Sequence, residues 1–383
     1  MPARLLALLS LLFLTVAHSA LAQVAPPTIA ARSWLLYDQT TGQVLAAHEP
    51  DLKVEPASLT KIMTVYLAFD ALREKRITLD QRPAVSQAAY KAIGSRMFVE
   101  PTKPATVEEL LNGVIVQSGN DASIVLAEAL AGTEEAFAEQ MNRTAQRMGL
   151  RNTQFRNSTG LPDPQHYTTA RDLATLAQRM IEDFPEQFPL YSQREYTYNN
   201  IRQPNRNRLL AIDPTVDGMK TGHTEAAGYC LIATAKRDMP GLEGKRRLIS
   251  IVLGAASESA RAIESQKLLN YGYQNFEVVR VQAKGQPAGT YEVWKGSADT
   301  VDGGFDSDVL VSVPRGQADQ VKAEIERVQP LIAPIAQGQR IGTLRVRIGE
   351  QLVTERPLLA LASVEPAGWF GRAWDSLLLM LSR

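Results

Sequence analysis

"PASLTKIMT", residues 56–64, places Ser58 three positions ahead of Lys61 at the start of an almost wholly apolar run. Nearly all residues from Ile62 to Phe69 are apolar. A helix that is apolar on nearly all sides is a buried helix. Burying a lysine ammonium costs free energy unless the amine is paired or loses its proton. The stretch therefore predicts a core helix whose lysine has a chemical task.

Ser58 and Lys61 have the spacing of a nucleophile and its base. Side chains at i and i+3 share one face of a helix, and Pro56 just ahead suits a helix start. Backbone N–H groups at a helix N-terminus can hold a developing oxyanion, and a neutral lysine can take a proton from a serine. A capping serine without chemistry is the alternative for this short pattern alone.

Two further motifs follow in order along the chain. "QSGNDAS" contains Ser118-Gly119-Asn120, and "DGMKTGHTEAAGYC" contains Lys220-Thr221-Gly222, which we place at the head of a strand. The order and separations match the S-x-x-K, S-x-N and K-T-G triple of penicillin-interacting enzymes. Three motifs in this order are a much stronger signal than any one of them, so they favour acyl transfer through a serine.

The sequence around these motifs resembles that of a known family. "MFVEPTKPATVEELLNGVIVQSGNDAS", "TGLPDPQHYTTARDLATLA" and "VDGMKTGHTEAAGYCL" resemble the low-molecular-mass penicillin-binding proteins, specifically the serine D-alanyl-D-alanine carboxypeptidases of the type of penicillin-binding proteins 5 and 6. The resemblance covers essentially the whole chain. It implies an α+β fold: a transpeptidase/β-lactamase-like catalytic domain, with an antiparallel sheet flanked by helices, followed by a small all-β domain. It implies no cofactor, and no histidine has a close metal-ligand spacing.

The resemblance also implies a role for each motif position. Ser58 would attack the carbonyl between the last two D-alanines of a peptidoglycan stem pentapeptide, and Lys61 would accept its proton. Backbone N–H groups of Ser58 and His223 would form the oxyanion hole, and Ser118 would pass a proton toward the leaving amine. β-Lactam antibiotics, which mimic D-Ala-D-Ala, would acylate Ser58. The expected substrate-binding residues are Asn120, Lys220, Thr221, Gly222, His223, Thr224 and Arg261, the last of which has a helix-surface position as its alternative.

The N-terminus predicts export. Arg4 precedes an apolar run from Leu5 to Val16, and Ala20-Leu21-Ala22 completes the pattern of a secretory signal peptide. The run is shorter than the roughly 20 residues that span a bilayer. An ordinary N-terminal helix is the alternative. We expect cleavage after Ala22, and the resemblance implies an enzyme peripheral to the periplasmic face of the bacterial inner membrane.

The C-terminus predicts a membrane contact. "GWFGRAWDSLLLMLSR", residues 368–383, places tryptophans and leucines on one helix face and arginines on the other. Such a helix suits the membrane interface, although docking on its own domain is the alternative. The predicted domains are a signal peptide (1–22), a catalytic domain (23–276), a β-rich domain (277–362) and an amphipathic anchoring helix (363–383). A formal net charge of zero argues against a nucleic-acid partner.

Periodicity predicts the order of the elements. Ser33 to Glu49 reads as a hairpin, and residues 56–201 read as mainly helical, with a capping box at Thr106 to Glu109. "YCLIATAKR" and "RRLISIVLGAA" are strands, and Arg261 to Tyr273 is a helix. Helices between early and late strands suggest that the two ends of this domain share one sheet. Alternation of apolar and polar residues after Phe276 predicts the small β domain.

Three other functions use some of the same features. A β-lactamase shares the triple, but its E-x-x-L-N pattern follows S-x-N, whereas here Glu108 to Asn112 precedes Ser118 and fits a capped helix better. A muropeptide endopeptidase cannot be separated by the motifs. A non-catalytic muropeptide-binding protein would not need all four of Ser58, Lys61, Ser118 and Lys220.

Overall fold

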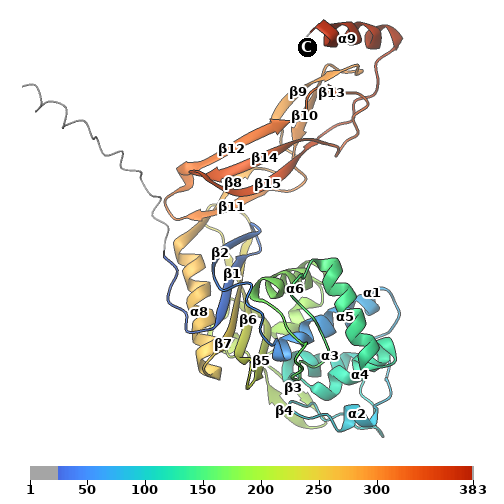
Figure 1. The fold of residues 1–383 in the computed structure, drawn as a ribbon, viewed down its shortest axis with the longest axis vertical. Helices are drawn as coiled ribbons and strands as arrows, with labels where there is room; N and C mark the ends of the chain where they lie inside the picture. The colour runs from blue at the N-terminus through green and yellow to red at the C-terminus, as the bar shows by residue number, and fades with distance from the viewer. Residues whose placement is uncertain (1–24, 382–383) are drawn as a thin grey trace, which may run out of the picture.

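The computed structural model describes residues 25–381 and folds them into two lobes joined end to end (Figure 1). The predicted signal peptide lies outside the described residues. The larger lobe holds every predicted site residue, and from β8 to β15 the smaller lobe is built from strands apart from one short 3₁₀ turn, Ala318–Gln320.

A five-stranded antiparallel sheet forms the centre of the larger lobe, in the order β2-β1-β7-β6-β5. Its early hairpin pairs with the late strand β7, so the prediction that both ends of the domain share one sheet is confirmed. The predicted hairpin is also confirmed. The strands are β1 (Ser33–Asp38), β2 (Gln43–His48), β5 (Val216–Thr224), β6 (Gly228–Asp238) and β7 (Lys245–Ala255).

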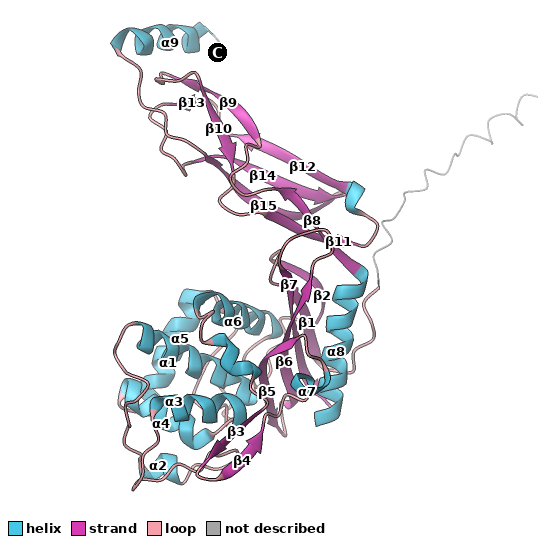
Figure 2. Ribbon diagram, turned by 180° about the vertical axis from the view of Figure 1, so that it is seen from behind, coloured by secondary structure: helices cyan, strands magenta, loops and turns pink. Residues whose placement is uncertain are grey.

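Helices cover both faces of this sheet (Figure 2). Alternate strand residues point to opposite faces: Leu35 and Ile251 join the core under the helical cluster, whereas Leu36 and Val252 join the core under α8 (Glu258–Asn275). The helical cluster consists of α1 (Lys61–Arg73), α2 (Gln87–Tyr90), α3 (Val107–Asn112), α4 (Asn120–Ala131), α5 (Glu134–Met148) and α6 (Ala170–Asp183).

Helix α1 is buried along almost its whole length, as the apolar run predicts. Two details differ from the prediction. Ser58 lies in a 3₁₀ turn, Ala57–Thr60, whose first residue has a left-handed φ of 48°, and α1 begins only at Lys61. Lys220 lies within β5 and not at its head, because Gly218 already pairs with Thr234 of β6.

The region predicted as mainly helical also ends in structure that the pattern did not indicate. A two-stranded hairpin follows the helices. Within the helical part, the predicted capping box is confirmed: the side chains of Thr106 and Glu109 each accept a hydrogen bond from the other's backbone N–H group. The additional elements are a π-helical turn (Gly113–Gln117), a 3₁₀ turn (Phe188–Ser192), β3 (Glu195–Tyr198), β4 (Ile201–Pro204) and α7 (Leu209–Ile212).

The smaller lobe begins where α8 ends at Asn275 and β8 begins at Phe276, and the domain boundary at 276/277 stays a prediction. A six-stranded sheet in the order β12-β14-β15-β10-β9-β13 faces a β11–β8 pair, which confirms an all-β lobe. The strands are β8 (Phe276–Gln282), β9 (Gly289–Trp294), β10 (Thr300–Gly304), β11 (Val309–Pro314), β12 (Val321–Arg327), β13 (Leu331–Ile332), β14 (Arg340–Ile348) and β15 (Gln351–Ala360).

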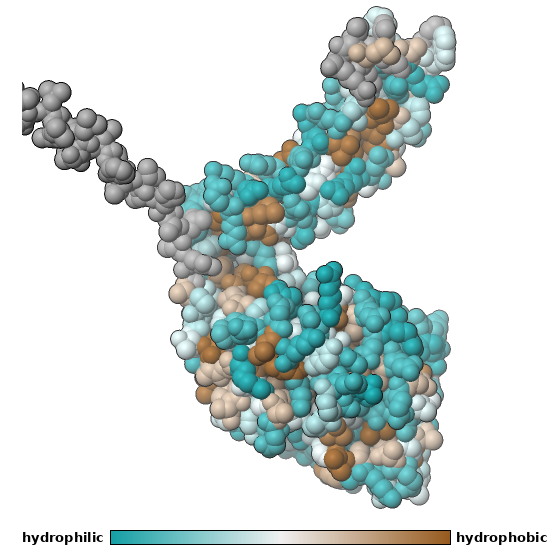
Figure 3. Space-filling view, in the orientation of Figure 1, coloured by the Kyte–Doolittle hydropathy of each residue, from teal (hydrophilic) through white to brown (hydrophobic). Residues whose placement is uncertain are grey.

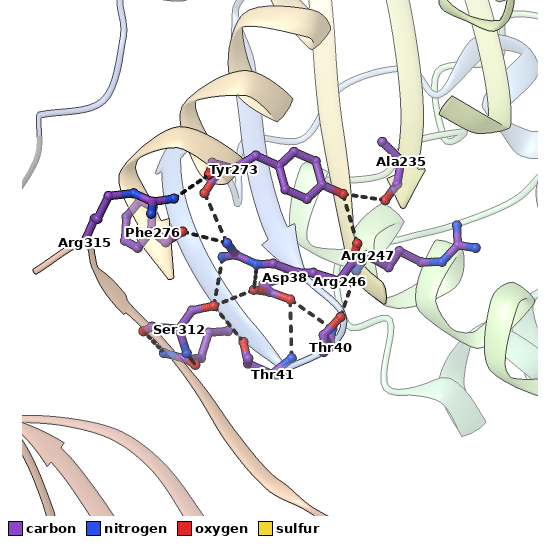
Figure 4. A network of polar contacts seen from close by, with 12 residues as sticks. Asp38, Thr40, Thr41, Ala235, Arg246, Arg247, Tyr273, Phe276, Ser312 and Arg315 are labelled. Carbon is purple, nitrogen blue, oxygen red and sulfur yellow. Dashed lines mark hydrogen bonds and ion pairs between the residues drawn. The ribbon is translucent and has the colours of Figure 1, made fainter. Parts of the chain in front are cut away.

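A buried polar network joins the two lobes (Figure 4). Asp38 at the end of β1 accepts hydrogen bonds from Arg246 Nε (2.7 Å) and from Ser312 Oγ of β11. Arg246 also donates to the Phe276 carbonyl at 2.9 Å. In the space-filling view the visible surface is mostly hydrophilic, and the lobes diverge from this junction (Figure 3).

Helix α9 (Trp369–Leu381) lies at the end of the smaller lobe farthest from the larger one (Figure 1). The carboxylate of Asp375 accepts a hydrogen bond from the backbone N–H of Lys295, which ties the helix to the end of β9. Within residues 25–381, no helix combines the length and the apolar character needed to cross a membrane.

Candidate active site

The three sequence motifs meet in one cleft of about 400 Å³ between strand β5 and the helical cluster. Ser58 comes from the 3₁₀ turn before α1, Ser118 follows the π-helical turn, and Asn120 is the first residue of α4. The remaining walls come from β5, α8 and three loops. The lining residues are Ser58, Gly94, Ser95, Ser118, Asn120, Thr159, Gly160, Leu161, Arg206, Thr221, Gly222, His223, Thr224 and Arg261.

Two glycines let the turn that carries Ser58 pack tightly. A Cβ atom on Gly160, whose φ is +83°, would lie 1.8 Å from the Ala57 carbonyl oxygen. A Cβ atom on Gly222 would lie 3.1 Å from the Pro56 carbonyl oxygen. The glycine of K-T-G is therefore needed for the close approach of β5 to the turn, which fixes the distance between Ser58 and the strand.

Lys61 is fully buried, and its amine has three partners. Nζ lies 3.0 Å from Ser58 Oγ, 2.7 Å from Asn120 Oδ1 and 2.6 Å from the Thr159 carbonyl oxygen. The last two oxygens can only accept hydrogen bonds. A neutral amine gives one N–H to each and keeps its lone pair for the Ser58 hydroxyl. Burial, helped by the nearby Arg206 charge and opposed by Asp121 and Glu134, lowers the pKa of Lys61 to about 7.

Ser118 presents a free hydroxyl to the cleft. Its backbone is left-handed, with φ 62° and ψ 36°, and its buried Oγ has no hydrogen-bond partner among the described residues. A buried hydroxyl without a partner is costly, so a group of the substrate would satisfy it. Asn120 is more constrained, because its Oδ1 accepts from Lys61 and its Nδ2 donates to the Ile93 carbonyl at 2.7 Å.

Lys220 and Arg261 are buried basic residues, one within β5 and the other in contact with it. Lys220 is buried, and its Nζ donates to the Thr221 carbonyl at 3.1 Å. Burial, together with the charges of Lys61, Arg206 and Arg261, holds the pKa of Lys220 well below its usual value. Arg261 is 4% exposed and donates to the Gly222 carbonyl, so it is not a helix-surface arginine.

His223 and Thr224 also line the cleft, and the Thr224 hydroxyl already has hydrogen-bond partners. The His223 ring packs against the Tyr229 ring, with 4.0 Å between centroids and 32° between the ring planes. Thr224 Oγ1 donates to Glu55 at 2.8 Å and accepts from the Ala227 N–H. Because the one hydroxyl proton of Thr224 is already engaged, Thr221 is better suited to meet a substrate carboxylate.

Sequence reasoning missed several lining residues. Arg206 stands in "NRNR", where no motif marks it, yet its guanidinium acts on Lys61, Lys220 and Arg261. Gly94 and Ser95 belong to a loop without a pattern of its own. Thr159 is the first residue of the quoted "TGLPDPQ" segment, but its role comes through a backbone carbonyl, which no side-chain motif records. Of the described residues that line the cleft, none is acidic.

Comparison with known proteins places these features in a family. The sequence model for "D-alanyl-D-alanine carboxypeptidase" matches residues 20–257, and that for "Penicillin-binding protein 5, C-terminal domain" matches residues 276–366. The D-alanyl-D-alanine carboxypeptidase DacC of Escherichia coli (strain K12) is 41% identical over 96% of this chain and 92% of its own length. DacA of Haemophilus influenzae is 38% identical over 93% of this chain and 91% of its own length.

Solved structures agree with the sequence matches. Penicillin-binding protein 5 from Haemophilus influenzae superposes with a TM-score of 0.83 at 38% identity, over 89% of this chain and 99% of that one. Penicillin-binding protein D2 from Listeria monocytogenes, solved in an ampicillin-bound form, has a TM-score of 0.59 at 28% identity over 65% of this chain and 99% of that one. Because the match extends through both lobes at this level of identity, the chain belongs to the family of D-alanyl-D-alanine carboxypeptidases.

Proposed function

We propose that the chain removes the terminal D-alanine from peptidoglycan stem peptides that end in D-Ala-D-Ala, through an acyl-enzyme on Ser58. Serine-type D-Ala-D-Ala carboxypeptidase activity follows from the family. The roles of individual residues are our assignment. The observation that carries them is the position of Lys61 Nζ, 3.0 Å from Ser58 Oγ and bonded to two oxygens that only accept, so that a neutral amine directs its lone pair at Ser58.

The proposed reaction has two halves. Lys61 takes the Ser58 proton as Oγ attacks the penultimate D-Ala carbonyl, and the backbone N–H groups of Ser58 and His223 hold the oxyanion. The bond to the last residue then breaks, its amine takes a proton by way of Ser118, and free D-alanine leaves. Water, activated by the same lysine, hydrolyses the ester and releases the shortened peptide.

Positive charge places the substrate before the chemistry begins. Arg206 and Arg261 line the part of the cleft where the terminal carboxylate would lie, and Thr221 adds a hydroxyl donor. The amine of Lys220 lies buried next to Thr221, on the same strand. The Arg206 charge also disfavours a proton on Lys61. Substrate capture and activation of the base thus share the Arg206 guanidinium.

A β-lactamase function is not favoured. The Glu108 to Asn112 segment forms the capped helix α3 and does not line the cleft, where no described residue is acidic. A carboxylate that activates water for rapid deacylation is therefore not part of these walls. We expect β-lactams to acylate Ser58 and to leave slowly.

Intact mass spectrometry and a D-alanine assay test the proposal together. The purified mature chain should release D-alanine from diacetyl-Lys-D-Ala-D-Ala and should gain one benzylpenicillin adduct that persists for minutes. Ser58→Ala should do neither. Rapid drug destruction without a lasting adduct would instead indicate a β-lactamase, and release of D-alanine by Ser58→Ala would refute the nucleophile.

We further propose that α9 holds the enzyme at the periplasmic face of the inner membrane. Trp369, Trp374 and Met380 are 68%, 62% and 76% exposed, whereas Asp375 turns toward the β lobe. Exposed tryptophans on a short terminal helix suit the interfacial region of a bilayer. Deletion of residues 366–383 should move the protein from the membrane fraction to the soluble fraction. If the truncated protein still sediments with membranes, the anchor lies elsewhere.

A further inference from the structure

A second cavity adjoins the catalytic cleft and shares one wall with it. It has a volume of about 520 Å³ and is formed by the segment that leads from β4 through α7, with the start of α8. Arg206 lines both cavities. Arg194 and Arg208 are the other basic residues of this second cavity, which we call the arginine pocket.

The arginine pocket carries more positive charge than its own side chains neutralise. No ion pair or side-chain hydrogen bond joins Arg194 or Arg206 to another of the residues that the structure describes. Arg208 has one distant partner, Glu258 at 3.9 Å, and the same carboxylate lies 3.6 Å from Arg261. One glutamate therefore faces several guanidinium groups, and the surplus charge favours an anion.

The floor of the arginine pocket is apolar. Leu210 is buried, and Ile212 is 60% exposed at its edge, next to Ala211. An exposed isoleucine beside unpaired arginines suits a ligand that has both an alkyl stem and a charged end. The chemistry of the walls thus matches a carboxylate on a short aliphatic chain better than it matches an inorganic anion.

The position of the pocket relates it to the leaving group. Glu258 and Arg261 lie one turn apart on α8, and Arg261 contacts Gly222 at the end of the cleft where we place the terminal carboxylate. The arginine pocket therefore opens beyond the residue that is released, on the opposite side from the acyl part of the substrate that stays on Ser58.

We propose that the arginine pocket is a subsite for an acidic side chain on the residue that leaves. This inference rests on the proposed function, because it needs the orientation of the peptide in the cleft. The cleft accepts a terminal residue with a small side chain. When the terminal side chain is instead two or three carbons long and ends in a carboxylate, it gains contacts with Arg194, Arg206 and Arg208.

The test uses three peptides that differ only in the last residue: diacetyl-Lys-D-Ala followed by D-Ala, D-Glu or D-Gln. D-Glu and D-Gln have the same shape and differ in charge. For the full mature chain, kcat/KM for the D-Glu peptide should exceed that for the D-Gln peptide by about three- to fivefold, the size of a partly exposed charge pair. The ratio should fall as NaCl is raised, because exposed charges are screened.

Arg194→Gln/Arg208→Gln should bring this ratio to about one. The matched control is Arg143→Gln/Arg345→Gln, which removes the same charge from α5 and β14, outside both cavities, and should keep the ratio. Equal rates for D-Glu and D-Gln in the unaltered chain would overturn the subsite, as would hydrolysis of neither while D-Ala is released. Failure to release D-Ala from the first peptide would instead refute the proposed function, so the two outcomes are distinct.

Discussion

At the scale of single residues, the chemistry depends on the protonation of Lys61. Its surroundings oppose one another: burial and the Arg206 charge lower the pKa, whereas the carboxylates of Asp121 and Glu134 raise it, and the balance is a pKa of about 7. An amine with this pKa is half neutral near neutral pH, so it can act as a base there. An ordinary lysine would remain protonated.

The pKa of Lys61 predicts how acylation varies with pH. Because only the neutral amine can take the Ser58 proton, the second-order rate of acylation by benzylpenicillin should rise as pH increases through about 7. Arg206→Gln removes a charge that lowers this pKa, so the midpoint should move to higher pH. Stopped-flow or quenched mass spectrometry between pH 5.5 and 9 measures both. A profile that is flat over this range would exclude Lys61 as the titrating base.

The same pKa predicts a stability effect with a definite sign. The unfolded lysine keeps its ordinary pKa of 10.5, and the folded value is about 7, so the folded state loses stability as pH falls from above 10.5 toward 7. Lys61→Met removes this penalty, so the variant's gain in the free energy of unfolding should be about 2–3 kcal/mol larger at pH 6 than at pH 9. The difference in Tm between variant and parent should therefore be larger at pH 6. An equal difference at both pH values would contradict a buried, depressed amine.

At the scale of elements, Asp121 joins helix α4 to the loop that forms one wall of the cleft. Its fully buried carboxylate accepts hydrogen bonds from the N–H groups of Met97, Phe98 and Val99 at 2.9, 2.7 and 3.1 Å. The neighbouring Asn120 N–H donates to the Ser95 carbonyl. The loop therefore has its position because α4 begins where it does, and the start of α4 also supplies a partner of Lys61.

Asp121→Asn should affect binding and the pH profile together. An amide can accept fewer of these backbone bonds, so the loop of Gly94 and Ser95 loosens, and KM should rise more than kcat falls. Because the Asp121 carboxylate raises the pKa of Lys61, losing its charge should move the midpoint of the pH–rate profile to lower pH, the opposite of the shift expected for Arg206→Gln. Steady-state kinetics on the D-Ala-D-Ala peptide separates these effects. If the midpoint of the pH–rate profile does not shift, Asp121 acts only in packing.

The elements show why some of this arrangement was predictable from sequence. The buried α1, the Ser33–Glu49 hairpin and the Thr106 capping box follow from periodicity and local chemistry, and the fold class follows from the resemblance. The 3₁₀ turn at Ser58 was not predictable, since it depends on Gly160 and Gly222, which are distant in sequence. Arg206 and the Thr159 carbonyl act through space and leave no pattern. Local signals thus predict elements, and long-range packing decides the final geometry of the cleft.

At the scale of the whole molecule, the junction between the lobes is built like a core. Ser312 of β11 contacts Asp38 and Arg246 through its hydroxyl, and its backbone pairs with the Gln43 amide through two hydrogen bonds of 2.6 and 3.1 Å (Figure 4). Asp38 and Arg246 are both buried. A network with all its members paired resists bending, so we expect the β lobe to hold α9 and the cleft at a fixed separation.

Gln43→Ala/Ser312→Ala should weaken this junction and leave the cleft intact. The variant removes the side-chain hydrogen bonds that Gln43 and Ser312 make across the junction. Asp38 keeps its 2.7 Å bond to Arg246, so no buried charge is left unpaired. Small-angle scattering should then show a broader distribution of lobe-to-lobe distances, and calorimetry should resolve two unfolding transitions in place of one. Release of D-alanine from a small soluble peptide should stay within about twofold of the parent, because electrostatic and packing changes at this distance are usually additive with those of the site. If scattering and the unfolding transition are both unchanged, the lobes are held by the remaining hydrogen bonds, from Arg246 to Phe276 and from Arg315 to the carbonyls of Tyr273 and Gln274. Arg246→Met, which leaves the charge of Asp38 buried and unpaired, should then cost about 3–5 kcal/mol of stability.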